Sequence, residues 1–424
     1  MNRLKKIPFF YGWLVVAIAF LNLAVGYGTR ASFSVLLVAL LEKFEWRRGA
    51  ISGAFSLHSV VAGAGLPLIG AIVDRYGPRI LFPTGIAIMA FAIWQIGSIQ
   101  DLWHFYLYYG LILAFGRIMI SMTPHSAILA NWFKKKRGAA VGLASAGIAF
   151  GAVLLVPSFQ FALSRFGLQD GCAIVAATIF LLFFPLNAYF PRLKPADMGL
   201  APDGERPLES SSGKEGRKWD LPDASDDQTW TVRDALKTRR YWLLYSAFLL
   251  GSMVTMVDMH EIAYLVDAGY GKAEAAMIFA SVSLVQSFGT VCWGALSDRI
   301  GRENSYTLGV IFLIAGISTL LAIKGSSQSL WLVIFVICYG LGRGVNDSLM
   351  PSITADVFHG KRVGSIYGTL ATGLTFGAAF GPWLAGYLFD KNGNYFMPFM
   401  IAIMSFCLGC IMIWLAAPGK VRKK

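Results

Sequence analysis

Charged residues are scarce in this sequence. Asp, Glu, Lys and Arg make up 14% of its 424 residues, whereas 56% are hydrophobic. Soluble proteins carry roughly 25% charged residues, so a chain this apolar has too little polar surface to cover itself in water. The composition excludes an ordinary soluble protein and predicts an integral membrane protein.

Cysteine is also rare, and so are arrangements of reactive side chains. The five cysteines fall in apolar runs without metal-ligand spacing, so we interpret them as small hydrophobic core residues. No nucleophile elbow, paired-carboxylate pattern, His/Cys metal spacing or nucleotide-binding loop is present. The sequence therefore predicts no enzyme, no bound metal and no cofactor.

Basic residues exceed acidic ones, and the net charge is +13. They lie in short clusters between apolar runs, such as 134–137, which is typical of membrane topology and argues against a nucleic-acid partner. With both termini cytoplasmic, 27 of the 37 Lys and Arg lie on the cytoplasmic side and 7 lie in outer loops. Together with the short tails, this asymmetry predicts a multi-pass protein of the cell (inner) membrane with both termini cytoplasmic.

Twelve apolar runs approach the length of about 20 residues that a helix needs to cross a bilayer. They lie at 10–41, 49–73, 80–99, 103–132, 138–163, 172–190, 241–266, 273–297, 305–323, 329–356, 363–389 and 395–417. The segment between the sixth and seventh runs is rich in Pro, Ser and charge, with a short helix expected near 230–238. We predict an all-α fold with six-helix halves at 1–190 and 241–424, joined by a cytoplasmic linker at 191–240.

The two sets of six runs carry related motifs. The segment Gly70–Gly77, GAIVDRYG, recurs in the second half as Gly294–Gly301, GALSDRIG. Two copies of a six-helix unit in the same orientation predict parallel halves related by a pseudo-two-fold axis. A substrate site between them is expected for such a repeat.

This repeated loop resembles the signature of the major facilitator superfamily. The resemblance implies a twelve-helix fold of two pseudo-symmetric halves, with the motif acting as a gate. An Asp at a helix end can meet the positive end of a neighbouring helix, and a nearby Arg can pair across the cytoplasmic face. The gating residues implied are Gly70, Asp74, Arg75, Gly77, Gly294, Asp298, Arg299 and Gly301.

A narrower resemblance is to the monocarboxylate porters and the related bacterial oxalate/formate carriers. It rests on Trp132–Gly147, WFKKKRGAAVGLASAG, which is similar to the family's span-five signature, and on the Tyr-Gly-Trp at 11–13. Span eight of that family usually carries an Arg that binds the substrate carboxylate, and animal members add an Asp four residues earlier. This sequence has Thr290 and Gln286 at those two positions, so the usual anion anchor is missing.

Three arginines, Arg30, Arg117 and Arg343, lie inside spans one, four and ten. An Arg at mid-membrane costs about 2.5–3.5 kcal/mol on insertion scales, so each should face a cavity or a partner. The resemblance implies that these spans and span seven line the central cavity. Arg30 either anchors the anion, next to where animal porters carry a Lys, or snorkels to the outer interface. Arg117 lies off the usual pocket face.

Further substrate contacts are expected around these arginines. The resemblance implies Met122 in span four, together with Gln286 and Thr290 in span eight. Arg343 and Asp347 also match pocket-lining positions of the oxalate carriers, although those carriers have aromatic residues there. Met122, Gln286 and Thr290 therefore join the three arginines as candidate substrate-binding residues.

Acidic residues lie on the same cavity-lining spans. Arg343 and Asp347 are four residues apart, so they share a helix face and could pair directly. They form either a structural ion pair or a site where Arg343 meets an anion while Asp347 exchanges a proton. Asp258, His260 and Glu261 in span seven form a proton relay, an outer gate or a solvated rim. The histidine suits pH-linked coupling because its charge changes near neutrality.

The sequence therefore predicts a proton-coupled carrier of a small organic anion, resembling a monocarboxylate, that works by alternating access as a monomer in the lipid bilayer. The alternative is a carrier of another solute, such as a dicarboxylate, a zwitterion or a drug-like compound, working as an exporter or exchanger. A sensor is disfavoured because no sizeable soluble domain is present. A channel is disfavoured because paired gate motifs suit the rocking of two halves.

Overall fold

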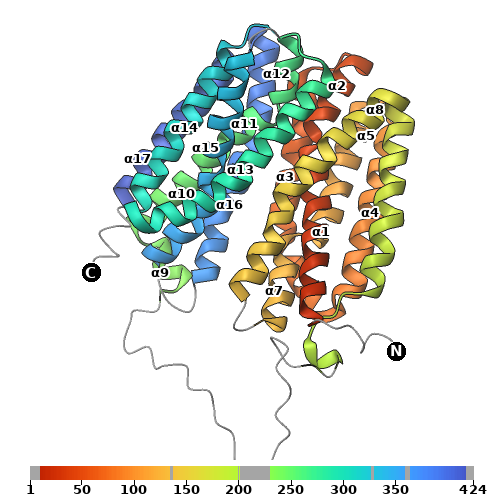
Figure 1. Ribbon diagram of the computed structural model, residues 1–424, viewed down its shortest axis with the longest axis vertical. Coiled ribbons are helices and arrows are strands. Elements are labelled where there is room, and N and C mark those ends of the chain that lie inside the picture. Colours follow the sequence, from red (N-terminus) through yellow and green to blue (C-terminus); the bar gives the residue numbers. More distant parts are fainter. Residues whose placement is uncertain are drawn as a thin grey trace, which may run out of the picture.

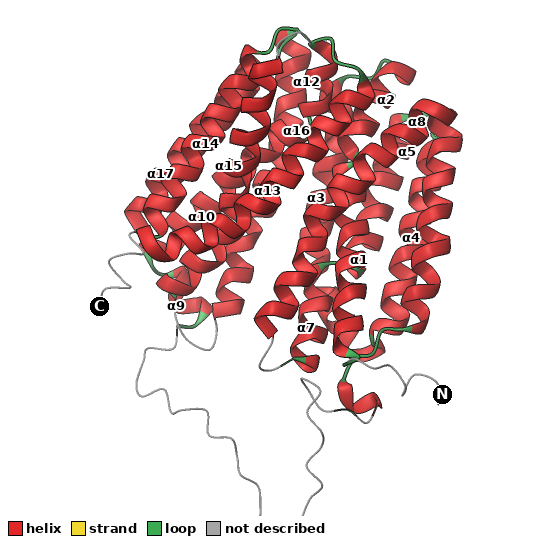
Figure 2. Cartoon of the chain, viewed as in Figure 1, coloured by secondary structure: helices red, strands yellow, loops and turns green. Residues whose placement is uncertain are grey.

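Long apolar helices make up the described part of the chain (Figures 1 and 2). The computed structural model describes residues 10–133, 137–198, 200, 230–325, 329–358 and 363–416. The first half contains α1 (Gly12–Ala31), α2 (Phe33–Phe44), α3 (Arg48–Tyr76), α4 (Pro78–Gly97), α5 (Leu102–Phe105), η2 (Tyr106–Leu113), α6 (Ala114–Met119), α7 (Met122–Trp132) and α8 (Arg137–Tyr189). The second half contains α10 (Arg239–Gly251), η5 (Ser252–Val254), α11 (Thr255–Asp258), α12 (Glu261–Asp267), α13 (Lys272–Ile300), α14 (Arg302–Ala322), α15 (Ser329–Val357), α16 (Val363–Asn392) and α17 (Phe396–Ala416). Between them lie η3 (Pro195–Met198) and α9 (Val232–Leu236), the latter confirming the short helix expected there.

Nine stretches of the described residues are long and apolar enough to cross a membrane. One of them lies in α8, which turns at Gly167 (φ +76°) and so supplies two crossing segments. Two further helices, α3 with 29 residues and α16 with 30, also exceed the length that a bilayer requires. The prediction of an all-α membrane fold with twelve spanning helices in two halves is confirmed.

The repeated motif ends in a glycine that reverses the chain in both halves. Gly77 connects α3 to α4, and Gly301 connects α13 to α14, with φ angles of +74° and +92°. Glycine adopts this region without the steric cost that a Cβ atom would impose. The tight helix–helix connection therefore explains the last residue of each copy of the motif.

The two halves meet at one end of the bundle and separate toward the other (Figure 1). Along the junction α3 packs on α16 and α8 packs on α13, while α2 packs on α12 at the closed end. The open end carries the start of α1, α9 and the end of α17. We call it the terminal end, and the closed end the far end.

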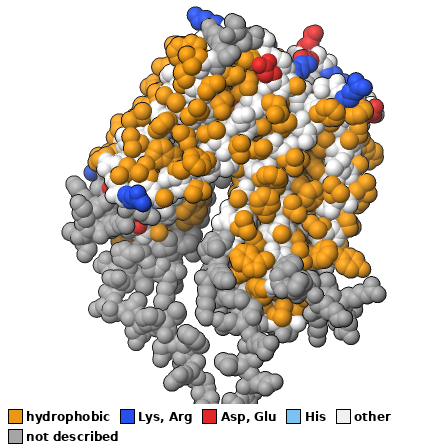
Figure 3. All heavy atoms as spheres, viewed as in Figure 1, with side chains coloured by type: hydrophobic (Ala, Val, Ile, Leu, Met, Phe, Trp, Pro, Cys, Tyr) orange, Lys and Arg blue, Asp and Glu red, His pale blue; other side chains and the backbone are white. Residues whose placement is uncertain are grey.

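Apolar side chains cover the flanks of the molecule in this view, as contact with lipid requires, and charged side chains lie at the far end and at the lower left edge (Figure 3). Two cysteines belong to this exposed surface, Cys292 and Cys407, whereas Cys172 is buried. The expectation that all five cysteines lie in the core is therefore wrong for two of them. In a lipid-embedded protein, an apolar run places small hydrophobic residues on the outer face as well as inside.

Close backbone contact joins α1 to α8. A Cβ atom added at Gly147 or Gly151 would collide with the carbonyl oxygen of Phe20 or Ala24, whereas one added at Gly142 would meet no atom within 4 Å. Small residues let two helices approach to this degree in a membrane. Gly147 and Gly151 therefore form a packing surface between α1 and α8, and Gly142 does not.

We expect Gly151→Ala to destabilise the protein by about 1–3 kcal/mol, because the new methyl group overpacks the contact between α1 and α8. Gly142→Ala is the matched control, since it adds the same atom in open space and should be neutral or slightly stabilising. Thermal unfolding of the purified variants in detergent measures both effects. Equal midpoints for the two variants would contradict the packing argument.

Candidate functional site

Arg30 lies near the end of α1, with α2 continuing beyond it, so its guanidinium is within the membrane-spanning part of the bundle. The side chain is half-buried and stands over the ring of Phe55, 4.8 Å from its centroid. It is within electrostatic range of Arg117 in its own half and of Asp258 in the other half. Charges of both halves therefore act on Arg30. Among the described residues, none of the ion pairs includes Arg30.

Arg117 on α6 is bound within the wall of the first half. Its Nε donates to His58 Nε2 at 2.9 Å, and its guanidinium lies 5.5 Å from the ring centroid of Tyr27. Because His58 Nε2 accepts this bond, its Nδ1 carries the proton and donates to the Tyr109 carbonyl at 3.1 Å. His58 is thus a core histidine with both ring nitrogens hydrogen-bonded.

Arg343 on α15 pairs with Asp258 on α11, with Nη2 and Oδ2 3.1 Å apart. Tyr339 donates its hydroxyl proton to Oδ1 of the same carboxylate at 2.6 Å. The predicted pair of Arg343 with Asp347 is therefore wrong. Helical side chains lean toward the N-terminus of their helix, so Arg343 reaches back toward Tyr339 and away from Asp347.

Asp347 instead lies exposed on α15, where Gln286 Nε2 donates to its Oδ2 at 2.9 Å. Thr290 is half-buried one turn further along α13 and donates its hydroxyl to the carbonyl of Gln286 at 2.9 Å. Met122, at the start of α7, is half-buried, with its sulfur 3.9 Å from the hydroxyl of Ser145. Gln286 and Thr290 stand at the positions of the family's usual anchor. Gln286 thus contacts the carboxylate of Asp347, and Thr290 contacts Gln286.

Span seven is broken into α10, η5, α11 and α12, and its three polar residues cluster at the last break. Asp258 ends α11, His260 precedes α12 and Glu261 begins it. All three are buried, Asp258 with 5% of its surface exposed and the others with none. The alternative of a solvated rim is excluded. Neither oxygen of Glu261 has a hydrogen-bond partner among the described residues.

A cluster of polar contacts closes the far end, and we call it the far-end latch: Arg48, Ser52, His260, Asp267, Asp390 and Tyr395. Arg48 of the first half binds Asp267 of the second at 2.8 Å and donates to the Tyr395 hydroxyl at 2.5 Å. Asp390 accepts the backbone N–H groups of Arg48 and Gly49, at 3.0 and 2.8 Å. These bonds fasten the start of α3 to the ends of α12 and α16.

His260 connects the latch to span seven. Its Nδ1 lies 3.0 Å from the Tyr395 hydroxyl, while its Nε2 lies 3.0 Å from the Pro382 carbonyl and 3.2 Å from the Ser52 hydroxyl. A carbonyl only accepts, so Nε2 carries the proton and Nδ1 accepts from Tyr395. A directed chain of hydrogen bonds therefore runs from Arg48 through Tyr395 to neutral His260.

Sequence reasoning missed most of the latch. The charge count places Arg48 among the basic residues of the outer loops, and no sequence pattern singles out Asp267, Asp390 or Tyr395. The available signal was weak: acidic residues at the ends of spans seven and eleven, opposite a basic residue at the start of span two. Only the packing of α3 on α16 brings these positions together.

The repeated gate motif is described in part. Gly77 and Gly301 form the turns, Gly294 lies on α13 with open space around it, and Arg299 is exposed. Position 70 and the side chains of Asp74, Arg75 and Asp298 lie outside the described residues. Next to the second copy, Arg302 binds Asp356 at 3.0 Å, which ties the start of α14 to the end of α15.

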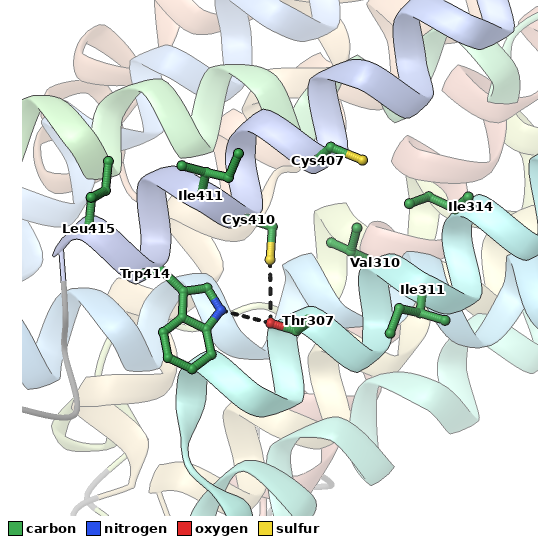
Figure 4. A pocket seen from close by; sticks show the side chains of 9 residues that line it. All are labelled: Thr307, Val310, Ile311, Ile314, Cys407, Cys410, Ile411, Trp414 and Leu415. Carbon is green, nitrogen blue, oxygen red and sulfur yellow. Dashed lines mark hydrogen bonds between the residues drawn. The ribbon is translucent and has the colours of Figure 1, made fainter.

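A groove of about 400 Å³ opens between α14 and α17, away from these charges (Figure 4). Its lining is Thr307, Val310, Ile311, Ile314, Cys407, Cys410, Ile411, Trp414 and Leu415. The Trp414 indole donates to the Thr307 hydroxyl at 2.9 Å, which leaves the lining apolar. A groove without a charged side chain suits lipid and not an anion.

Two six-helix halves that enclose buried charges at their junction and are fastened at one end define a membrane transporter. The chain belongs to the Major Facilitator Superfamily. The sequence model of that family matches residues 18–271 and 241–424. It is therefore a multi-pass membrane transporter and not an enzyme.

Curated relatives share about a quarter of the sequence. Monocarboxylate transporter 13 of Rattus norvegicus is 26% identical over 394 residues, covering 92% of this chain and 86% of the relative. The oxalate:formate antiporter of Oxalobacter formigenes is 25% identical over 422 residues, covering 95% and 91%. The chain is thus similar to named monocarboxylate transporters and to an oxalate/formate carrier, the group that its motifs resemble.

Solved structures share the fold. A bacterial homolog of the human lysosomal transporter Spinster, in an inward-facing and occupied conformation, superposes with a TM-score of 0.69 at 15% identity, covering 96% of this chain and 97% of that one. The nucleoside transporter NupG gives a TM-score of 0.70 at 12% identity, covering 96% and 98%. At such low identity the likeness supports the fold alone.

We expect Asp258→Asn to destabilise the protein by about 3–5 kcal/mol, because it leaves the Arg343 guanidinium buried without a counter-charge. Asp347→Asn is the matched control: it alters an exposed carboxylate with one described side-chain bond and should cost about 1 kcal/mol or less. Intrinsic tryptophan fluorescence during thermal unfolding in detergent reports both variants. A larger loss for the Asp347 variant would reverse our assignment of the ion pair.

Proposed function

We propose that this transporter is a proton-coupled carrier of a small organic anion, resembling a monocarboxylate, that works by alternating access. The observation that carries the proposal is Arg30, a guanidinium inside the membrane that is within electrostatic range of Asp258 in the other half and has no carboxylate within ion-pair distance among the described residues. A cation in that position needs a negative partner, and a substrate carboxylate supplies one.

The other two arginines differ in how much binding capacity they retain. Arg117 is occupied by His58 and Tyr27, so its part is to add positive potential beside Arg30. Arg343 binds Asp258 through Nη2, while its Nη1 is buried with no partner among the described residues. An anion between the halves would meet Arg30 on one side and the free N–H groups of Arg343 on the other. Charge-assisted hydrogen bonds to a guanidinium are among the stronger polar contacts in proteins.

Alternating access follows from the two ends of the bundle. The distribution of Lys and Arg supports a cytoplasmic position for both termini, which makes the terminal end the inner side of a cell membrane. The far-end latch would then close the outer side, and the separation of the halves would be inward-open. The Spinster homolog of similar fold is described as inward-facing.

The relatives support the choice of substrate class. Several are named monocarboxylate transporters, and one is named for the exchange of oxalate and formate. All of these names denote small carboxylates. The coupling proton requires an acidic group in the same region, which Asp258, Glu261 and Asp347 supply, with His260 beside them. A single chain suffices for this mechanism, so we propose a monomer.

One observation favours a second candidate, a zwitterion. The carboxylate of Asp347 is exposed, and Gln286 is the one hydrogen-bond donor described for it. An ammonium group on the substrate would pair with Asp347 while its carboxylate binds the arginines. Amino acids therefore belong in every substrate test.

The deciding experiment uses proteoliposomes with an imposed pH gradient. We expect uptake of labelled lactate, pyruvate, acetate or oxalate to rise when the gradient drives protons in the same direction, and to fall when the gradient is collapsed. Neutral sugars serve as the comparison. Uptake of an amino acid without any simple carboxylate would favour the zwitterion, and uptake of a sugar alone would exclude the anion proposal.

We expect Arg30→Ala to weaken anion binding roughly 10- to 150-fold, since a hydrogen bond to a charged group contributes about 1.5–3 kcal/mol. Arg165→Ala is the matched control, because Arg165 is an exposed arginine on α8. Thermal-shift titration with the transported carboxylate gives the affinities, since a ligand that binds the folded state raises the unfolding temperature. Unchanged affinity in Arg30→Ala would remove Arg30 from the site.

A further inference from the structure

Glu261 is a buried carboxyl group without a hydrogen-bond partner. It begins α12 directly after the break in span seven, and none of its surface is exposed. Neither oxygen has a partner among the described residues. An ionised carboxylate is too costly to bury without a donor, so a group in this position takes up a proton instead. Glu261 is therefore neutral in this state.

Arg343 has a buried hydrogen-bond donor that lacks an acceptor, whereas Glu261 has acceptors that lack a donor. Its Nη2 binds Asp258, and its Nη1 is buried with no partner among the described residues. Glu261 is within electrostatic range of both Arg343 and Asp258, yet it forms no ion pair with Arg343 here. One guanidinium therefore has one carboxylate bound, a second carboxyl group nearby and unused N–H groups.

The remaining charges around Glu261 are accounted for. Arg343 and Tyr339 on α15 and Asp258 on α11 are within electrostatic range of Glu261. His260 precedes it in the chain, and its two ring nitrogens lie in hydrogen-bond distance of the Tyr395 hydroxyl and the Pro382 carbonyl.

The other helices packed on α12 are α2 and α13. Glu42 at the end of α2 and Lys272 at the start of α13 are bound to each other at 2.5 Å, while Lys43 and Glu274 on the same two helices are exposed. On α12 itself, Asp267 is bound to Arg48 of the latch. Glu261 is thus the acidic group in this region that lacks a described partner while lying next to an unsaturated cation.

We propose that Glu261 carries the coupling proton and that, once deprotonated, it competes with Asp258 for Arg343. The step moves one proton: the carboxyl group of Glu261 loses it to the solvent as the local structure opens, and the carboxylate then accepts N–H groups of Arg343. No bond between heavy atoms forms or breaks. This inference rests on the proposed function, because it names the residue that couples protons to transport.

The exchange of partners would act on the far-end latch. To reach Arg343, Glu261 must move with α12 relative to α11, and the break at residues 259–260 allows that movement. His260 lies within the break and contacts Ser52 of the first half and Tyr395 of the latch. Drawing α12 toward α15 pulls His260 from Ser52 and loosens the contact between the halves. Protonated Glu261 therefore favours a closed far end, and deprotonated Glu261 an open one.

The test measures the opening of the far end without any substrate. Spin labels are attached to cysteines introduced at Arg47 and Glu274, two exposed positions in different halves, after the five native cysteines are replaced. Distances between the labels are measured by double electron–electron resonance in nanodiscs from pH 5 to pH 9. We expect a longer distance to gain population as the pH rises. Glu261→Gln should keep the short distance at every pH, and Glu261→Asp should restore a pH response.

Asp347→Asn is the discriminating variant, and it should keep the pH response because Asp347 is exposed and bound to Gln286. A response that persists in Glu261→Gln, or that disappears in Asp347→Asn alone, overturns the proposal. Size-exclusion chromatography and thermal unfolding establish that each variant is folded. If carboxylate uptake fails while this pH response depends on Glu261, the substrate class is wrong and the proton switch remains.

Discussion

The ion pair between Asp258 and Arg343 is the interaction on which the rest of the site depends. Lipid surrounds the bundle, so water is not freely available to replace a lost partner, and each buried charge must be satisfied inside the protein. Asp258 fulfils this for Arg343 with help from Tyr339. Among the described residues Arg30 remains without a carboxylate in ion-pair distance, and this is why we propose it as the place where a negative solute binds. Binding and stability are therefore two aspects of the same distribution of charge.

The breaks in span seven connect this charge distribution to the closure of the far end. A continuous helix would fix Asp258, His260 and Glu261 on one rigid rod. Separate short helices let each residue belong to a different contact: Asp258 to Arg343, His260 to the latch, and Glu261 to neither. Alternating access needs such an element, because a change at the centre must alter contacts between the halves some distance away.

The sequence was sufficient to predict the fold because the signals for it can be read along the chain. They are the length of the apolar runs, the positive charge in the loops and the repeated turn that ends in Gly77 and Gly301. It also located the arginines, since their insertion cost makes them stand out in apolar runs. It failed where partners come from packing. Spacing along α15 suggested Asp347 for Arg343, but the lean of the side chain selects Asp258. The burial of Glu261 and the role of Arg48 depend on how broken or distant helices meet, which no local pattern encodes.

The contact between α1 and α8 has a consequence for how substrate must arrive. Gly28 lies against the backbone of Gly151, where a Cβ atom would be 2.5 Å from the carbonyl oxygen. Two helices in contact through bare backbone cannot slide past each other without losing that fit. Arg30, two residues along α1, is thereby fixed in depth within the membrane. If Arg30 binds the solute as proposed, the solute and the opposite half travel to a cation that stays at one depth.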